Sequence, residues 1–312
     1  MILCCGEALI DMIPTPTTEG RDGFVPHTGG AVFNTAIALG RLGVQTGLLS
    51  GISTDLFGHQ LLNDLGASHV DTSHVVHSNR PTTLAFVQLS DGHATYSFFD
   101  ENSAGRMLQS SDVPNLSPEV SALYFGGISL ACEPGAEVYA DMAVQEHSKS
   151  AIMLDPNIRP GFIQDVDRYR VRLDRMIACA DIVKVSDEDL NWIFPGPEAL
   201  EEKVALLRVS GPSVVILTRG GDGASAWLSD GAMVKVPSNK VSVVDIVGAG
   251  DTFNAGVLAY LSERGLLTKT ALETISPDAV QDALSYGAAV AAVTVSRAGA
   301  NPPWREEVEL AH

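Results

Sequence analysis

The sequence predicts an α/β protein, in which a doubly wound, mostly parallel sheet is flanked by helices and carries a small β-sheet lid. Strand-like and helix-like patterns alternate along most of the 312 residues, which is typical of a parallel sheet with helices on both faces. A hairpin pattern, with strands at 83–89 and 95–99 around the turn pair Asp91-Gly92, interrupts this alternation. No linker, repeat or low-complexity tract divides the chain. We therefore expect one domain over residues 1–312, with lid segments near 12–28 and 83–106.

In the N-terminal part of the chain, apolar runs and the residues that end them predict the strands and helices. Strands are expected at 2–5 and 9–13, and a helix at 31–42, where small and apolar residues share one face and Gly43 provides the stop. A strand at 44–50 and a helix at 57–65 come next. Residues 14–27, which are rich in Thr, Pro and Gly, are expected to form a loop.

From residue 122 onward the alternation is regular. Short apolar runs between turn signals predict strands, and longer runs with a 3.6-residue period predict helices. The expected strands are 122–125, 152–155, 182–185, 214–218 and 224–228, and the expected helices are 135–147, 166–178 and 199–209. A β-rich run at 241–244 then leads into a glycine turn and another helical pattern.

Composition argues against several classes of protein. Lys and Arg total 20 against 38 Asp and Glu, a formal net charge of −18, and no basic cluster occurs, so we expect no nucleic-acid partner. The most apolar long stretch, 283–295, is too short and too rich in Ala to span a bilayer, so we expect no membrane partner. The four cysteines show no metal or disulfide spacing, and no basic secretory region is present, which favours the cytoplasm.

The strongest local signal is the glycine turn Gly248-Ala249-Gly250, which is followed at once by Asp251. Glycine allows a tight turn, and the amides at the start of a helix bind anions. A carboxylate beside a bound phosphate would repel it, so the position of Asp251 indicates phosphoryl transfer, with Asp251 taking the proton of the attacking hydroxyl. The alternative is that Asp251 is only a favourable first-turn acid. In either case we expect the start of the helix to lower its pKa.

Other glycine motifs do not fit. The sequence contains no GxxxxGK[ST] segment, which excludes a P-loop, and Gly250 has no glycine three residues later, which excludes the dinucleotide-binding fingerprint. The glycine-rich segment 218–223 lies between two strand patterns, so it predicts a hairpin and not a nucleotide-binding turn of the Rossmann type.

Two segments about two hundred residues apart resemble the signatures of the ribokinase-like (PfkB) carbohydrate kinases. Residues 245–251 resemble the C-terminal signature Asp-Thr-x-Gly-Ala-Gly-Asp, with Ile246 in place of Thr, and 29–43 resemble the N-terminal signature. Segments 6–14, 96–104 and 155–160 are similar to those of bacterial fructokinases. The resemblance covers nearly the whole chain and implies the ribokinase-like fold, ATP as cofactor and Mg²⁺.

The resemblance also implies roles for individual residues. Asp251 matches the general base, the amides of Gly248, Ala249 and Gly250 match the anion hole, and Arg159 matches a residue that reaches a phosphate. A sugar needs directional hydrogen-bond partners. The sugar site is expected to contain Asp11, Gly29, Gly30, Asn34, Phe98, Glu101 and Asn157. For Phe98, packing within the lid is the alternative interpretation.

Further positions match the nucleotide and cation sites of this family. Thr218, Gly220 and Gly223 match a segment whose backbone approaches the ATP phosphates, and Lys184 is expected to approach the nucleotide. Ser186 and Asp189 align with an Asn-x-x-Glu stretch linked to Mg²⁺, with Ser in place of Asn and Asp in place of Glu. The alternative is a helix N-cap, with Ser186 as the cap. Asp245, with carbonyls near 294–299, resembles a monovalent-cation site, for which K⁺ is a candidate ion.

The expected reaction is ATP-dependent phosphorylation of D-fructose to D-fructose 6-phosphate. Within the same class, 2-keto-3-deoxygluconate kinase and ribokinase are alternatives, and in another class the chain would be a non-catalytic sensor that binds sugar or nucleotide. The small-molecule partners are therefore a sugar and ATP, and the family suggests a homodimer formed through the lid.

Overall fold

The computed structural model describes residues 1–90 and 93–310. Its centre is a nine-stranded sheet in which the two strands at one edge, β14 and β15, run antiparallel to their neighbours and the other pairs are parallel. In spatial order the strands are β15 (Met233–Val236), β14 (Ala224–Leu228), β13 (Val214–Thr218), β12 (Ile182–Ser186), β11 (Ala151–Asp155), β10 (Ala122–Gly126), β1 (Ile2–Cys5), β4 (Thr46–Leu49) and β6 (Val70–Asp71). The predicted fold class is confirmed.

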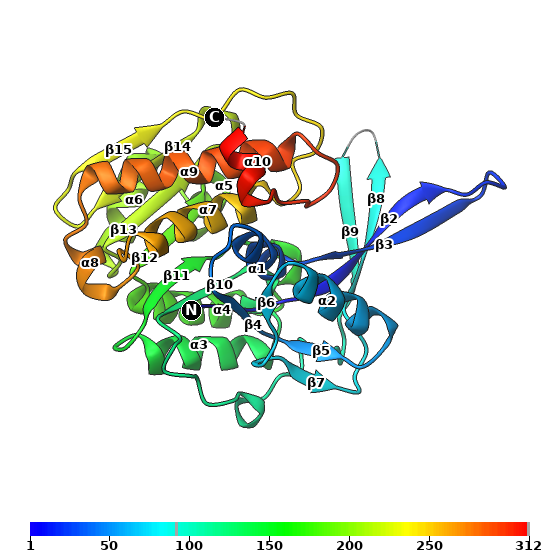
Figure 1. Cartoon of the computed structure of the whole chain (residues 1–312). Coiled ribbons are helices and arrows are strands. Elements are labelled where there is room, and N and C mark those ends of the chain that lie inside the picture. The colour runs from blue at the N-terminus through cyan, green and yellow to red at the C-terminus, as the bar shows by residue number, and fades with distance from the viewer. Residues whose placement is uncertain (91–92, 311–312) are drawn as a thin grey trace.

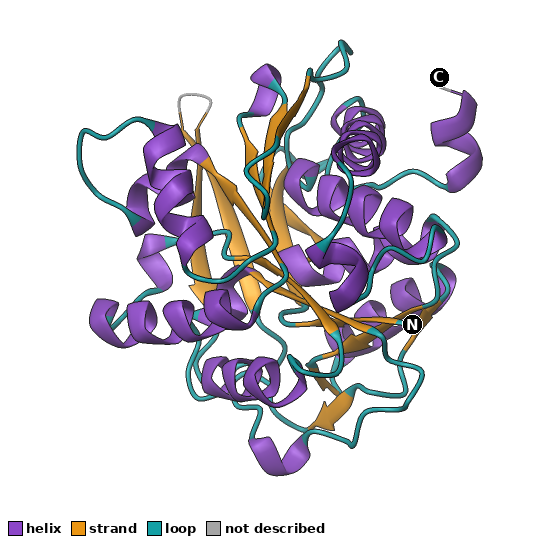
Figure 2. Ribbon diagram, turned by 90° about the vertical axis from the view of Figure 1, so that its left-hand side faces the viewer, coloured by secondary structure: helices purple, strands orange, loops and turns teal. Residues whose placement is uncertain are grey.

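Helices cover both faces of this sheet (Figure 2). Side chains alternate along each strand. Ile2 and Cys4 belong to one core, and Leu3 and Cys5 belong to the other. The first core is closed by α1 (Ala31–Arg41), α2 (Leu56–Ala67), α7 (Ala249–Glu263), α8 (Lys269–Glu273), α9 (Pro277–Val295) and α10 (Arg305–Leu310). The second is closed by α3 (Gly135–Glu146), α4 (Val166–Cys179), α5 (Asp187–Ile193) and α6 (Leu200–Val209).

The lid is a separate four-stranded sheet that projects from the body (Figure 1). Its order is β3 (Asp22–Gly29), β2 (Leu9–Pro16), β8 (Leu84–Ser90) and β9 (His93–Phe99). The strands predicted on either side of the 83–99 hairpin are confirmed, whereas its Asp91-Gly92 turn lies outside the described residues.

The loop expected at 14–27 was wrong, because β2 and β3 form a long antiparallel hairpin there. Strand β2 pairs with β8 only over Ile10, Asp11 and Met12. Pro14 and Pro16 therefore lie where β2 has a single neighbour, a position at which a strand tolerates proline. The prolines that suggested a loop mark an edge of the lid.

The β-rich run at 241–244 does not form a strand. It is exposed, and its contact with the body is the hydrogen bond from the Val244 amide to the Val295 carbonyl oxygen, at 2.8 Å. Its β-branched residues favour extended backbone, but none of the described strands pairs with them. Two short strands, β5 (Gly51–Ser53) and β7 (Val76–Ser78), form a further parallel pair. None of the helices in the described part of the chain is long and apolar enough to cross a membrane.

Candidate active site

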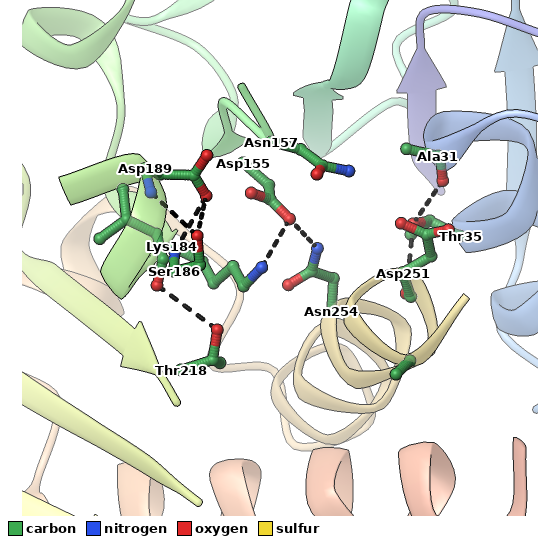
Figure 3. Close-up of polar contacts among 12 residues, drawn as sticks. Ala31, Thr35, Asp155, Asn157, Lys184, Ser186, Asp189, Thr218, Asp251 and Asn254 are labelled. Atoms are coloured by element: carbon green, nitrogen blue, oxygen red, sulfur yellow. Dashed lines mark hydrogen bonds and ion pairs between the residues drawn. The ribbon is translucent and has the colours of Figure 1, made fainter. Parts of the chain in front are cut away.

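Asp251 lies in the first turn of α7 and is almost completely buried, with 7% of its surface exposed. Its Oδ2 accepts a hydrogen bond of 2.9 Å from Nδ2 of Asn34 on α1. The neighbouring Thr35 donates its hydroxyl to the carbonyl oxygens of Ala31 and Asp251 (Figure 3). The starts of α1 and α7 are thus joined, and the two segments that carry the predicted signatures meet at this point.

The ionisation of Asp251 differs from the sequence-based expectation. Burial raises the pKa of Asp251 to about 7, although the hydrogen bond from Asn34 and the charge of Lys184 act in the opposite direction. The carboxylates of Asp155 and Glu7 raise it further. The expected lowering by the start of the helix was wrong, because the loss of solvation outweighs it. A carboxyl group with this pKa changes protonation near neutral pH, as a general base should.

The glycine turn is present as predicted, but its amides are not equivalent. Gly248 has a φ of 79°, in the left-handed region that favours glycine. No described residue accepts a hydrogen bond from the amides of Gly248, Gly250 or Asp251. The amide of Ala249 donates to the Ile246 carbonyl oxygen at 3.3 Å, so it is partly engaged in the turn. The open amides that could hold an anion are therefore those of Gly248, Gly250 and Asp251.

The predicted sugar residues Asp11, Gly29, Gly30 and Asn34 (the sugar cradle) lie where the lid meets the body. A Cβ atom on Gly29 would overlap Oδ2 of Asp11, so a larger residue at this position would displace that carboxylate. Gly30 begins α1 with a φ of 106° and lies against the backbone of Glu7. Burial raises the pKa of Asp11 to about 6. The backbone amide of Asn34 donates to the Gly30 carbonyl oxygen at 2.8 Å, and the side chain of Asn34 contacts Asp251.

The lid carries aromatic residues on the face that holds Asp11. Phe98 lies on this face, because Asp11 pairs with Ala85 and Ala85 pairs with Phe98. Its ring packs edge-on against Phe162 of the body, with centroids 4.1 Å apart. This contact supports the packing alternative for Phe98 without excluding contact with a sugar.

Glu101 and Tyr96 are two further polar residues of the lid. Glu101 is exposed in the turn after β9, and its place in the sugar site stays a prediction. Tyr96 was not predicted, although it lies on the same face as Phe98 and stacks on its ring at 5.8 Å. Burial raises the pKa of Tyr96, and the charge of Asp11 adds to this effect. The two-residue spacing from Phe98 was the signal that could have identified Tyr96.

Asn157 and Arg159 follow β11, at the carboxyl edge where the other site residues gather. Asn157 has a φ of 42°, an uncommon value for a residue other than glycine. Arg159 is exposed and donates to the carbonyl oxygen of Ile158 at 3.2 Å, which leaves most of its guanidinium donors accessible.

Lys184 lies on the body side of the glycine turn. Its Nζ donates to Oδ2 of Asp155 at 3.0 Å and lies 3.4 Å from the position that a Cβ atom on Gly250 would occupy. The ammonium group is therefore next to the backbone amides that could hold an anion.

Ser186 and Asp189 form a helix cap. The Ser186 hydroxyl accepts a hydrogen bond from the Asp189 amide, and Oδ2 of Asp189 accepts bonds from the Ser186 amide and hydroxyl. Oδ1 of Asp189 accepts a bond of 2.7 Å from the Ile158 amide. Both carboxylate oxygens are engaged and only 4% of the residue is exposed. The geometry thus supports the capping alternative for this pair over the metal role.

The predicted glycine hairpin follows β13 and is confirmed by its antiparallel pairing with β14. Thr218 ends β13, and its side chain lies beside the end of β12 (Figure 3). Gly220 has a φ of 49°, and no atom lies within 4 Å of where its Cβ would be, so its backbone is open to a ligand. Gly223 has a φ of 88°, and a Cβ atom there would overlap the Val236 carbonyl oxygen.

Asp245 connects the two loops of the predicted cation site. Its Oδ1 accepts from the Val247 amide at 3.0 Å, and its Oδ2 accepts from the Gly299 amide at 2.9 Å. In the described residues, no group of three or more His, Cys, Asp or Glu side chains could hold a metal ion.

Residues 1–307 match the family described as pfkB family carbohydrate kinase. The chain belongs to this family. It is 49% identical to a fructokinase of Rhizobium leguminosarum bv. trifolii over 283 residues, which cover 90% of the chain and 86% of the relative. The fructokinase of Xylella fastidiosa, solved with bound ATP, superposes with a TM-score of 0.91 at 27% identity, covering 99% of this chain and 97% of the other.

A further similar structure is that of the Vibrio cholerae fructokinase in its form with bound fructose, ADP and calcium ion. It has a TM-score of 0.81 at 25% identity, and 96% of this chain and 94% of the other are covered. As a pfkB family member the chain is a sugar kinase that uses ATP.

The family signatures did not include Asn254, which lies at the centre of the site and contacts Asp155 (Figure 3).

Proposed function

We propose that this kinase transfers the γ-phosphoryl group of ATP to the C6 hydroxyl of D-fructose and forms D-fructose 6-phosphate. The observation that carries the proposal is Asp251, a buried carboxyl group with a pKa of about 7 that lies between Asn34 of the sugar cradle and the open amides of the glycine turn. The relative from Rhizobium leguminosarum, a fructokinase at 49% identity, supports fructose as the acceptor.

In the proposed reaction the C6 oxygen of fructose attacks the γ-phosphorus as the bond to the bridging oxygen of ADP breaks. Asp251 accepts the proton of the attacking hydroxyl, and the amides of Gly248 and Gly250 stabilise the charge on the transferring phosphoryl oxygens. Asp11 accepts hydrogen bonds from sugar hydroxyls and orients the ring. Arg159 and the backbone at Gly220 approach the phosphates of the nucleotide.

We propose Mg²⁺ as the divalent ion, which would neutralise charge on the ATP phosphates. Mg²⁺ keeps several waters and is commonly held by one or two carboxylates together with phosphate oxygens. Asp189 is only 4% exposed, and its two oxygens already accept three hydrogen bonds from Ser186 and Ile158, so that residue does not fit a direct ligand role. Asp245 does fit a site for K⁺, because it is only partly buried and each of its oxygens accepts a single hydrogen bond, which leaves a lone pair on each.

We further propose that residues 1–312 act as one domain whose lid closes over the sugar. The outer face of the lid supports the expected homodimer, because Phe24 and Phe99 are 44% and 58% exposed and pack at right angles on Phe86 between them. An exposed aromatic patch of this kind favours association.

The four cysteines form no disulfide, which supports a reducing compartment such as the cytoplasm.

Arginine pairing in the lid favours fructose over a sugar acid. A kinase for 2-keto-3-deoxygluconate needs a cation for the carboxylate of its substrate. Arg106, which follows the last lid strand, is paired with the buried Asp100 at 2.9 Å. Asp100 also accepts hydrogen bonds from Thr83 and Ser103. The charge of Arg106 is therefore already paired within a local network.

The test is ADP release with Mg·ATP and a panel of D-fructose, D-ribose and 2-keto-3-deoxygluconate. Fructose should give the highest kcat/KM, and Asp251→Asn should lower kcat by about 10²–10⁴-fold with fructose still bound. Asp278→Asn, which removes an exposed first-turn acid from α9, is the matched control and should leave the rate unchanged. Binding of fructose without turnover would support the sensor, and a higher kcat/KM with another sugar would overturn the choice of fructose.

A further inference from the structure

A buried polar cluster lies behind the glycine turn. Asp155 ends β11 and Lys184 lies on the adjacent β12, and the register of these strands places the two side chains next to each other. Asn254 is one helical turn after Gly250 on α7, and its Nδ2 donates to Oδ2 of Asp155 at 2.7 Å (Figure 3). The exposed fractions of Asp155, Lys184 and Asn254 are 1%, 5% and 0%.

Within this cluster, Lys184 has a single hydrogen-bond acceptor among the described residues, the carboxylate of Asp155. Oδ2 of Asp155 accepts from both Lys184 and Asn254. An ammonium group has three donors, and Asp155 is the only described side chain or backbone group that accepts from Lys184. The remaining donors are therefore not engaged by described residues, and the ammonium group lies 3.4 Å from the position of a Cβ atom on Gly250.

The cluster is also incompletely satisfied. Oδ1 of Asp155 and Oδ1 of Asn254 are buried, and neither has a hydrogen-bond partner among the described residues. A buried polar atom without a partner costs stability. A network selected only for stability would not leave two such atoms beside a paired lysine, whereas active sites commonly do.

We propose that Asn254, acting through Asp155, is a positioning residue that fixes the ammonium group of Lys184 beside Gly250, where it adds a full positive charge to the amides of the anion site. This inference rests on the proposed function and assigns a role to a residue outside the family signatures. Asn254 does not contact the reacting atoms. It restrains Asp155, and Asp155 restrains Lys184.

The electrostatics agree with this arrangement. Burial lowers the pKa of Lys184, but the charges of Asp155 and Asp189 outweigh it, so the pKa lies above its ordinary value and the lysine stays charged. The charge of Lys184 also lowers the pKa of Asp251. The carboxylates of Asp155 and Glu7 act in the opposite direction and raise the pKa of Asp251. Displacing Lys184 should therefore weaken phosphate binding and raise the pKa of Asp251 together.

The test compares Asn254→Leu, Lys184→Met and the double variant. Asn254→Leu should lower kcat by up to about 10²-fold, because a misplacement of about 1 Å has an effect of this size. The KM for fructose should change little, since the sugar cradle is untouched. The acid limb of the profile of kcat/KM against pH should move to higher pH in both single variants. The double variant should be no slower than Lys184→Met, because Asn254 acts only through that lysine.

The control is Asn191→Leu, in the second turn of α5, which removes one hydrogen-bond partner of another buried lysine, Lys203 of α6. It should lower the melting temperature without moving kcat or the pH profile. If Asn254→Leu does not fold, Asp155→Asn takes its place, because it removes the anchoring charge without changing the shape, and it should reproduce the loss in kcat and the pH shift.

Calorimetric binding of Mg²⁺ with a non-hydrolysable ATP analogue separates this inference from the proposed function. Asn254→Leu and Lys184→Met should both weaken this binding, whether or not fructose is the acceptor. Unchanged nucleotide affinity and kcat in a folded Asn254→Leu protein, or additive losses in the double variant, would overturn the positioning role. Absence of turnover with every sugar, together with weakened binding in both variants, would overturn the proposed function alone.

Discussion

The hydrogen bond between Asn34 and Asp251 connects the sugar cradle to the proposed base. Nδ2 of Asn34 donates to Oδ2 of Asp251 at 2.9 Å, and both side chains are buried. This bond stabilises the ionised carboxylate and so lowers the pKa of Asp251, against the larger effect of burial. Replacing Asn34 with leucine removes the donor and keeps a side chain of similar volume. The pKa of Asp251 should therefore rise above its present value of about 7.

The size of the shift follows from the strength of the bond. A hydrogen bond to a charged group contributes about 1.5–3 kcal/mol, and one pKa unit corresponds to about 1.4 kcal/mol. The pKa of Asp251 in the Asn34→Leu variant should then be about 8–9. At pH 7 the ionised fraction of Asp251 would fall from about one half to about 1–10%, which lowers the rate about five- to fiftyfold.

The assay is the profile of kcat/KM against pH for ADP release with fructose. It runs from about pH 5.5 to about pH 9.5, which includes the pKa of Asp251 expected for the unaltered protein and for Asn34→Leu. Loss of a sugar contact lowers kcat/KM equally at every pH, whereas loss of the bond to Asp251 moves the acid limb to higher pH. The two effects of Asn34→Leu are therefore separable in one experiment.

Thr35→Val is the matched control. Thr35 follows Asn34 on α1 and donates its hydroxyl to the main-chain carbonyl oxygen of Asp251 at 3.2 Å, not to the carboxylate. Valine has nearly the same shape, so this variant should leave the acid limb where it is. If Asn34→Leu lowers kcat/KM uniformly, with its acid limb at the position of the unaltered protein, then Asp251 is not the base or the bond does not tune it.

Two further predictions concern the sugar cradle and the nucleotide hairpin. Because burial raises the pKa of Asp11 to about 6, the carboxylate is ionised above that pH, and the dissociation constant for fructose should increase as the pH falls through 6. Asp11→Asn should weaken fructose binding and abolish this pH dependence, which calorimetry measures between pH 5 and pH 7, about one unit either side of the pKa. If the dissociation constant of the variant still depends on pH, a group other than Asp11 causes the dependence. Gly223→Ala should destabilise the protein by about 1–3 kcal/mol, because its positive φ and the Val236 carbonyl both oppose a side chain. Gly221→Ala, with no atom within 4 Å of its Cβ position, should leave the thermal unfolding unchanged, and equal melting temperatures for the two variants would refute the strain argument.

The fold was predictable because local patterns specify it. Alternating strand and helix periods require a covered parallel sheet, and the glycines at 29, 30 and 248 mark places where the backbone approaches another group or adopts a positive φ. These requirements act on single residues, so they can be recognised in one sequence. The lid hairpin at 14–27 was missed because Pro14 and Pro16 suggest a loop unless the one-sided pairing of β2 is known.

The chemical state of the site was less predictable, because it depends on burial and on partners distant in sequence. The start of a helix suggested a lowered pKa for Asp251, yet the surroundings that bury it raise the pKa to about 7. Its hydrogen-bond partner Asn34 is 217 positions away. The amide of Ala249 was expected to be open, but a turn geometry that no motif specifies directs it to Ile246.

The cluster of Asp155, Lys184 and Asn254 behind the glycine turn also depends on partners that are distant in sequence. Lys184 could be associated with the nucleotide from its motif, but its dependence on Asp155 follows from the register of β11 and β12. A shift of one residue in that register would turn Asp155 to the opposite face of the sheet. The ammonium group would then lose its anchor although every residue of the family signatures stayed in place. The position of the Lys184 charge therefore depends on the packing of the sheet against α7, and substitutions at Asn254 test that packing directly.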